Sequence, residues 1–75
     1  MRDRYLKAEQ DYLVKIGKNI RTIRKKKGLS QEKLSRISKL DRTYIGGVER
    51  GERNISLLNI RKIAAALNVS ETDIF

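Results

Sequence analysis

Two short helical segments in the middle of the chain, within residues 30–51, constrain the fold more than any other feature. Ser30 and Asp41 are residue types that cap the start of a helix, and each precedes a run of about two helical turns, 31–38 and 42–50. Helices of this length are not stable alone, because nucleation is costly and few hydrogen bonds follow it. Both segments therefore require packing against the rest of the chain.

The apolar residues of these segments predict how they pack. Leu34 and Ile37 are three residues apart in the first segment, and Ile45 and Val48 are three apart in the second. Residues with this spacing share one side of a helix. Two short helices joined by a few residues bury both pairs only by crossing steeply, which predicts a helix-turn-helix.

The outer face of the second segment predicts contact with DNA bases. The N-terminal residues of a recognition helix read base edges, and here they are Arg42, Thr43 and Tyr44. Arginine binds guanine through two hydrogen bonds, and threonine hydrogen-bonds a base or contacts a thymine methyl group. Gly46 and Gly47 cost about 2 kcal/mol of helix stability relative to alanine. We interpret them as an open surface for close approach of the backbone to DNA; the alternative is that they only relieve packing.

The charge of the chain is +9 and is unevenly distributed. Residues 1–27 contain ten Lys and Arg against three acidic residues, 28–55 contain six against four, and 56–75 contain two against two. The basic end should face a polyanion, which leaves the neutral end for another contact. With three Tyr and one Phe as the aromatic residues, a base-stacking platform for single strands is not expected.

Composition excludes several classes of protein and site. The chain has no cysteine and no histidine, which excludes a disulfide framework, a zinc finger and an imidazole base. Asp41 and Glu49 have no nucleophile or metal ligands beside them, so we expect no enzyme, cofactor or metal. No apolar run approaches the roughly 20 residues that span a bilayer. We expect a soluble cytoplasmic protein without membrane contact.

Before the central segments, we expect an N-terminal extension over 1–11 and a helix over about 12–27. Its apolar residues Leu13, Ile16, Ile20 and Ile23 recur at intervals of three and four, as in an amphipathic helix. The other faces are basic, and the candidates for phosphate contact are Arg21, Lys25 and Lys27. Alternatively, these cations are a solvated face that favours the negative end of the helix dipole.

After Gly51, a polar loop leaves the recognition segment. A loop in this place stays near the DNA backbone, so Arg50, Arg53 and Asn54 are candidates for phosphate contact. Such contacts position a protein without reading the base sequence. The alternative is that they are only loop residues.

The C-terminal part predicts two further helices. Ser56 caps a helix over about 57–67, with Ile60, Ile63, Ala64 and Leu67 on its core side, and Asn68 ends it. Ser70 and Asp73 have the spacing of a capping box, which predicts a short fifth helix.

Leu58 and Phe75 are apolar residues at the neutral end of the chain, outside the expected core stripe. An apolar patch there predicts a two-fold dimer contact. The alternative is that both residues cover the core of the monomer.

The chain resembles the phage-repressor and Cro-type helix-turn-helix family in three sequence segments: NIRTIRKKKGLSQEKLS, LDRTYIGGVERGERNIS and NIRKIAAALNVS. The resemblance extends over about residues 13–75 and is greatest to the controller proteins of restriction-modification systems. It implies an all-α, five-helix, lambda-repressor-like DNA-binding domain over 12–75. It also implies a homodimer that binds an approximately palindromic double-stranded operator and regulates transcription.

The resemblance also implies roles for single residues. Gln31 would contact phosphate, and Arg24 would form an ion pair with Glu49 at the end of the recognition helix. Lys39 stands where the family usually has glycine, which implies strain or a different shape in the turn.

Two other functions remain as alternatives. The chain could be the DNA-targeting domain of a larger protein, such as a methyltransferase. In a different class, its basic first helix could be an interaction or membrane-surface module without a role on DNA.

Overall fold

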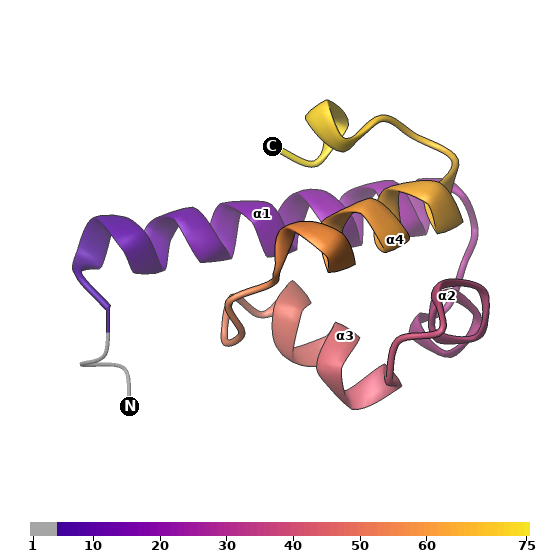
Figure 1. The fold of residues 1–75 in the computed structure, drawn as a ribbon, viewed down its shortest axis with the longest axis horizontal. Helices are drawn as coiled ribbons and strands as arrows, with labels where there is room; N and C mark the ends of the chain where they lie inside the picture. The colour runs from indigo at the N-terminus through magenta and orange to yellow at the C-terminus, as the bar shows by residue number, and fades with distance from the viewer. Residues whose placement is uncertain (1–4) are drawn as a thin grey trace.

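The computed structural model describes residues 5–75, which form four α-helices and one 3-10 turn. No strand occurs within this range. Figure 1 shows α1 running along the length of the molecule, with α2 and α3 on one side of it and the C-terminal turn on the other. The elements, in chain order, are α1 (Lys7–Lys26), α2 (Gln31–Ser38), α3 (Arg42–Glu49), α4 (Leu57–Leu67) and the 3-10 turn η2 (Glu71–Asp73).

The predicted capping residues set the ends of these helices. The side chains of Ser30, Asp41 and Ser56 each accept a hydrogen bond from a backbone N–H two or three residues later, at 3.0–3.2 Å. These bonds satisfy donors that the first turn of a helix leaves unpaired. Gly28 and Asn68 follow α1 and α4 with φ of 74° and 59°, the left-handed conformation that ends a helix. The positions of α2, α3 and α4 are thus confirmed.

The core lies between the helices and is entirely aliphatic. Its buried residues are Ile16, Ile20, Leu34, Ile45, Val48, Ile60, Ile63, Ala64, Leu67 and Ile74. The prediction that Ile37 is buried with Leu34 is wrong, because Ile37 is 46% exposed. Instead, Ser38 turns inward, where its hydroxyl accepts a hydrogen bond from the Leu40 N–H at 3.3 Å. The inner side of α2 therefore serves the turn that follows it.

In the turn between α2 and α3, a lysine adopts the left-handed backbone conformation that favours glycine. Lys39 has φ 66° and ψ 20°, and its N–H donates to the Ser35 carbonyl at 2.8 Å. A non-glycine residue in this left-handed region is costly because Cβ crowds the backbone. Of the two expectations for Lys39, strain or a different shape of the turn, the structure therefore supports strain in a turn of ordinary shape.

Helix α1 begins at Lys7, five residues before the predicted start at residue 12. The Glu9 carboxylate accepts the Leu6 N–H at 3.0 Å, which satisfies a donor at the helix start. Gln10 donates its amide to the Gly51 carbonyl at 2.7 Å, a contact that only the folded chain brings about. Part of the predicted extension over 1–11 is thus helical, while its residues 1–4 lie outside the described residues.

The prediction of five helices is wrong, because the fifth segment is a single 3-10 turn and the α-helices number four over residues 5–75. The capping box forms, with Asp73 accepting the Ser70 N–H at 3.1 Å, but it spans the whole element. The side chain of Ile74 is fully buried, and its carbonyl accepts a hydrogen bond from Asn19 at 2.8 Å. The chain turns into the core at Ile74 instead of continuing a helix.

Candidate nucleic-acid interface

Arg42 and Thr43 are exposed at the start of α3, as the sequence predicts for residues that read bases. Opposite them, Ile45 and Val48 are buried, so the orientation of the helix is set by the core. The Arg42 guanidinium donates to the side-chain oxygen of Gln31 at 3.3 Å. The first turn of α2 therefore supports the side chain at the start of α3.

Tyr44 differs from its two neighbours, because it is half-buried and turned towards α4. Its hydroxyl accepts a hydrogen bond from the Asn59 amide at 3.0 Å. The Arg53 guanidinium lies over its ring, 5.5 Å from the centroid, within the range of a cation–π contact. In this conformation Tyr44 supports other side chains, and base contact by Tyr44 stays a prediction that requires its hydroxyl to leave Asn59.

The two glycines of α3 are buried, so the expectation of an open glycine surface is wrong. A Cβ atom on Gly47 would lie 2.9 Å from Cγ of Arg53, and one on Gly46 would lie 3.3 Å from a guanidinium nitrogen of Arg50. The long side chains of Arg50 and Arg53 therefore fold back over the two glycines of the helix. Close approach of DNA to this backbone requires Arg50 and Arg53 to move, and it stays a prediction.

The ion pair implied for Arg24 and Glu49 is present and joins α1 to the end of α3. Nε and Nη2 of Arg24 donate to the two carboxylate oxygens of Glu49 at 2.6 and 2.9 Å. Both side chains are buried. The remaining groups are also bonded: Nη1 of Arg24 donates to the Leu29 carbonyl at 2.8 Å, and Gln31 donates to Glu49 at 3.0 Å. The pair is therefore satisfied on every side, as a buried charge requires.

A basic hollow of about 350 Å³ lies between the ends of α1, α2 and α3. Its lining residues are Arg21, Arg24, Gln31, Glu49 and Arg50. Since Arg24 and Glu49 neutralise each other, the exposed cations Arg21 and Arg50 give the hollow its charge, although Arg50 also pairs with Glu52 at 3.1 Å. The structure thus brings three predicted phosphate contacts together: Arg21, Gln31 and Arg50.

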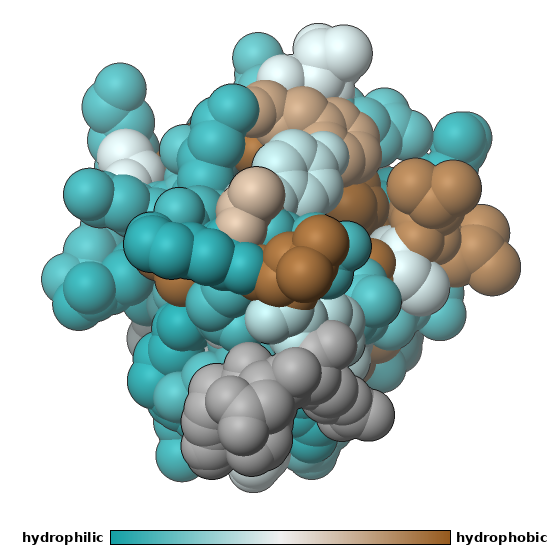
Figure 2. Space-filling view, turned by 90° about the vertical axis from the view of Figure 1, so that its left-hand side faces the viewer, coloured by the Kyte–Doolittle hydropathy of each residue, from teal (hydrophilic) through white to brown (hydrophobic). Residues whose placement is uncertain are grey.

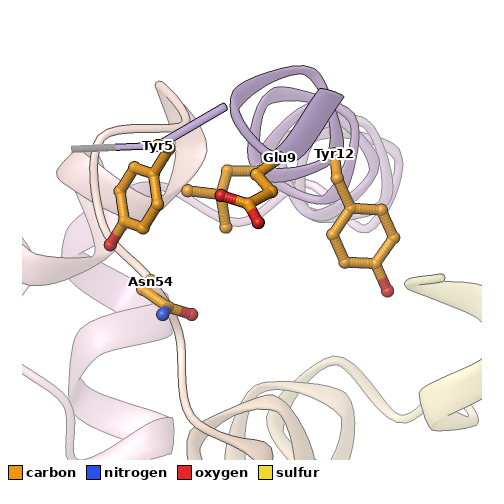
Figure 3. A pocket seen from close by; sticks show the side chains of 5 residues that line it. Tyr5, Glu9, Tyr12 and Asn54 are labelled. Carbon is orange, nitrogen blue, oxygen red and sulfur yellow. The ribbon is translucent and has the colours of Figure 1, made fainter. Parts of the chain in front are cut away.

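The other predicted phosphate contacts lie elsewhere. Lys25 and Lys27 are exposed near the end of α1 and do not line this hollow, although Lys25 follows Arg21 by one helical turn. Arg53 lies over Tyr44, whereas Asn54 lines a second hollow of about 280 Å³ with the first turns of α1. Figure 3 shows Asn54 beside Tyr5, Glu9 and Tyr12. Arg53 and Asn54, which are adjacent in the loop after α3, therefore point in different directions.

Both predicted dimer residues reach the surface. Leu58 is 71% exposed at the start of α4, and Phe75 is 42% exposed at the end of the chain. Figure 2 shows apolar residues among hydrophilic ones at the end of the molecule where α1 begins. The other large exposed apolar residues include Leu6, Tyr12 and Leu57. The high exposure of Leu58 argues against the alternative that this residue covers the core of the monomer.

Sequence reasoning did not identify three residues that hold this surface in place: Gly17, Gln10 and Asn59. Gly17 is the only one with a visible signal, because glycine inside a helix suggests close contact with another backbone. A Cβ atom on Gly17 would lie 2.2 Å from the Val48 carbonyl oxygen. The contacts of Gln10 and Asn59 join distant parts of the chain and have no local pattern.

Among the described residues, 5–75, no group of three or more acidic, cysteine or histidine side chains could hold a metal ion. In the same range, no helix combines the length and apolar character needed to cross a membrane.

Comparison with protein families matches residues 20–74 to the helix-turn-helix family (HTH_3). A hypothetical transcription factor of Neisseria meningitidis is 51% identical over 65 residues, which are 87% of this chain and 61% of that protein. The chain therefore spans less than two thirds of the length of this relative.

Two solved structures are also similar. One is the restriction-modification controller protein C.AhdI of Aeromonas hydrophila, with a TM-score of 0.85 and 54% identity, covering 87% of this chain and 98% of that one. The other is a tetramer of the controller protein C.Esp1396I in complex with its natural 35-base-pair operator, with a TM-score of 0.78 and 43% identity. It covers 84% of this chain and 83% of that one.

Proposed function

The chain belongs to the helix-turn-helix family, and on that premise we propose that it is a sequence-specific regulator of transcription that binds double-stranded DNA as a homodimer. The observation that carries this proposal is the placement of Arg42 and Thr43. They are exposed at the start of a helix whose opposite side is buried, and Arg42 is hydrogen-bonded to Gln31, which lines the basic hollow.

In the proposed complex, α3 enters the major groove with its first turn towards the bases. Arg42 binds guanine through two hydrogen bonds, and Thr43 contacts the neighbouring base or its methyl group. Gln31 supports Arg42 through the 3.3 Å hydrogen bond, so the guanidinium is partly oriented before DNA arrives. A side chain that is already oriented loses less conformational entropy on binding.

Arg21 and Arg50 supply the contacts to the DNA backbone in this proposal. Each neutralised phosphate releases counterions, so affinity falls as salt concentration rises. These contacts set the position of the protein on the duplex and carry no base preference of their own. Base reading and backbone binding are therefore assigned to different side chains.

The homodimer of the proposal forms through the exposed apolar residues Leu58 and Phe75. Two-fold symmetry places two copies of α3 in successive major grooves, about 34 Å apart, on an approximately palindromic site. The similar protein C.Esp1396I binds its operator as a tetramer. A dimer of this chain could therefore also pair with a second dimer on adjacent sites.

The similarity to two restriction-modification controller proteins supports a narrower proposal: this chain regulates restriction-modification genes in the cytoplasm. The test is footprinting on the DNA upstream of its own gene, with a mixed-sequence duplex as competitor. We expect a protected, approximately palindromic site that survives excess competitor. If the mixed-sequence competitor removes the protein from the upstream DNA as readily as from mixed-sequence DNA, sequence-specific regulation is contradicted.

A further inference from the structure

We propose that Gly47 and Asn59 are positioning residues for Arg53 and that they act through Tyr44. The proposal rests on the proposed DNA-binding function and adds to it a set of four residues from α3, the following loop and α4. Neither Gly47 nor Asn59 needs to touch DNA in this role. Together they determine where the Arg53 guanidinium is held.

Gly47 provides the space in which the Arg53 side chain lies. A Cβ atom at this position would lie 2.9 Å from Cγ, 3.5 Å from Nε and 3.7 Å from Cδ of Arg53. Cγ is close to the backbone, so a rotation at the end of the side chain does not relieve the first contact. Any residue larger than glycine therefore forces Arg53 into another rotamer. This requirement accounts for a glycine in the middle of an eight-residue helix, where it is otherwise unfavourable.

Tyr44 and Asn59 form the support for the guanidinium. The Arg53 guanidinium lies over the Tyr44 ring, 5.5 Å from its centroid. The Tyr44 hydroxyl accepts a hydrogen bond from Asn59 at 3.0 Å, which ties the ring to α4. Because α4 is anchored in the core by Ile60 and Ile63, this bond transfers the rigidity of the core to the ring.

The charge of Arg53 is available to a ligand. Arg50, three residues earlier, pairs with Glu52 at 3.1 Å, whereas Arg53 makes no ion pair with any residue in the range 5–75. Arg53 is also exposed at the loop that follows the recognition helix. A supported guanidinium that has no ion-pair partner among residues 5–75 and lies beside that helix is suited to a phosphate of the DNA backbone, because less side-chain entropy is lost on binding.

A double-mutant cycle tests the inference with a fluorescein-labelled mixed-sequence duplex of about 24 base pairs, because phosphate contacts act on any sequence. The variants are Gly47→Ala, Arg53→Ala and the double substitution. We expect each single variant to bind about fivefold more weakly and to lower the slope of log K against log salt by about 1. The double variant should bind no more weakly than Arg53→Ala alone.

Stability measurements separate positioning from damage to the fold. Alanine favours a helix over glycine, so the unfolding temperature of Gly47→Ala should stay the same or rise. Asn59→Ala serves as a second variant: it should weaken binding in the wild-type background and have no effect in the Arg53→Ala background. Arg61→Ala, which removes an arginine held 3.7 Å from Glu71 at the C-terminal turn, is the charge control and should bind as the wild type does.

The outcomes distinguish the inference from the function on which it rests. If Gly47→Ala weakens binding equally with and without Arg53, the added methyl group blocks DNA directly and the inference is wrong. If Gly47→Ala and Asn59→Ala both bind as the wild type, the inference is also wrong. Failure of the wild type to bind any duplex in 50 mM salt, a condition that strengthens phosphate contacts, would instead contradict the proposed function.

Discussion

Arg24 and Glu49 form a buried ion pair with two hydrogen bonds, of 2.6 and 2.9 Å, between the last turns of α1 and α3. The planar guanidinium and the carboxylate match in geometry, so the pair restricts the relative orientation of the two helices. Glu49 lies next to Val48 at the end of α3, and the pair thus fixes the recognition helix at the end opposite Arg42. Gln31 then links the same carboxylate to the Arg42 side chain.

Arg24→Met should lower the free energy of unfolding by about 3–5 kcal/mol, because it leaves the Glu49 carboxylate buried without its cation. Urea denaturation followed by circular dichroism measures this change. The double variant Arg24→Met, Glu49→Leu is the control, since it removes both charges. It should recover a large part of the loss, and a double variant as unstable as the single one would contradict the explanation.

Gly17→Ala should destabilise the protein although alanine favours a helix by about 1 kcal/mol. The added Cβ would lie 2.2 Å from the Val48 carbonyl oxygen and 2.7 Å from that of Glu49, and neither backbone atom can rotate away. We expect a net loss of about 1–3 kcal/mol, typical of overpacking, in urea denaturation. Thr22→Ala, at an exposed position of α1, should change stability little. A more stable Gly17→Ala would show that α1 and α3 are not in close contact.

Lys39→Gly should raise the free energy of unfolding by about 1 kcal/mol. Lysine adopts φ 66° at this position, and glycine has no Cβ to crowd the backbone there. The measurement is the midpoint of thermal unfolding. Lys33→Gly, an exposed position inside α2, is the matched control and should lower stability by about 1 kcal/mol, since glycine disfavours a helix. Equal effects of the two variants would contradict strain at Lys39.

Arg42→Ala should reduce the preference for the protected site over mixed-sequence DNA by about tenfold, because one guanine contact is lost. Arg21→Ala should weaken both complexes alike and lower the salt slope by about 0.9. Competition binding measured at several salt concentrations reports both quantities. An equal loss on both DNAs for Arg42→Ala would remove this residue from base reading.

Leu58→Glu should shift the protein from dimer to monomer without unfolding it. Leu58 is 71% exposed, so the substitution leaves the core intact and places a charge in the proposed apolar contact. Sedimentation equilibrium measures the oligomeric state, and circular dichroism checks the fold. Thr22→Glu, at an exposed position of α1, is the control for one added negative charge. Unchanged association of Leu58→Glu would show that the dimer forms elsewhere.

Local sequence patterns predict the position of some residues of the site, but they do not predict which side chains are free to contact DNA. Arg42 and Thr43 are found from their place after the Asp41 cap, because a helix start and its apolar side are local properties. Tyr44 has the same local position, yet its hydroxyl is bound to Asn59, fifteen residues later in the chain. Whether a side chain on a helix surface is free depends on what packs beside it.

The positions of α2, α3 and α4, their caps and most of the core follow from local sequence, since capping bonds and apolar periodicity act within a few residues. The packing of the helices places Ile37 on the surface and turns the chain inward at Ile74 before a fifth helix forms. It also decided that Arg50 and Arg53 cover Gly46 and Gly47. These outcomes depend on contacts between segments that are distant in the chain, where space, charge and hydrogen-bond partners are supplied only when the helices have packed.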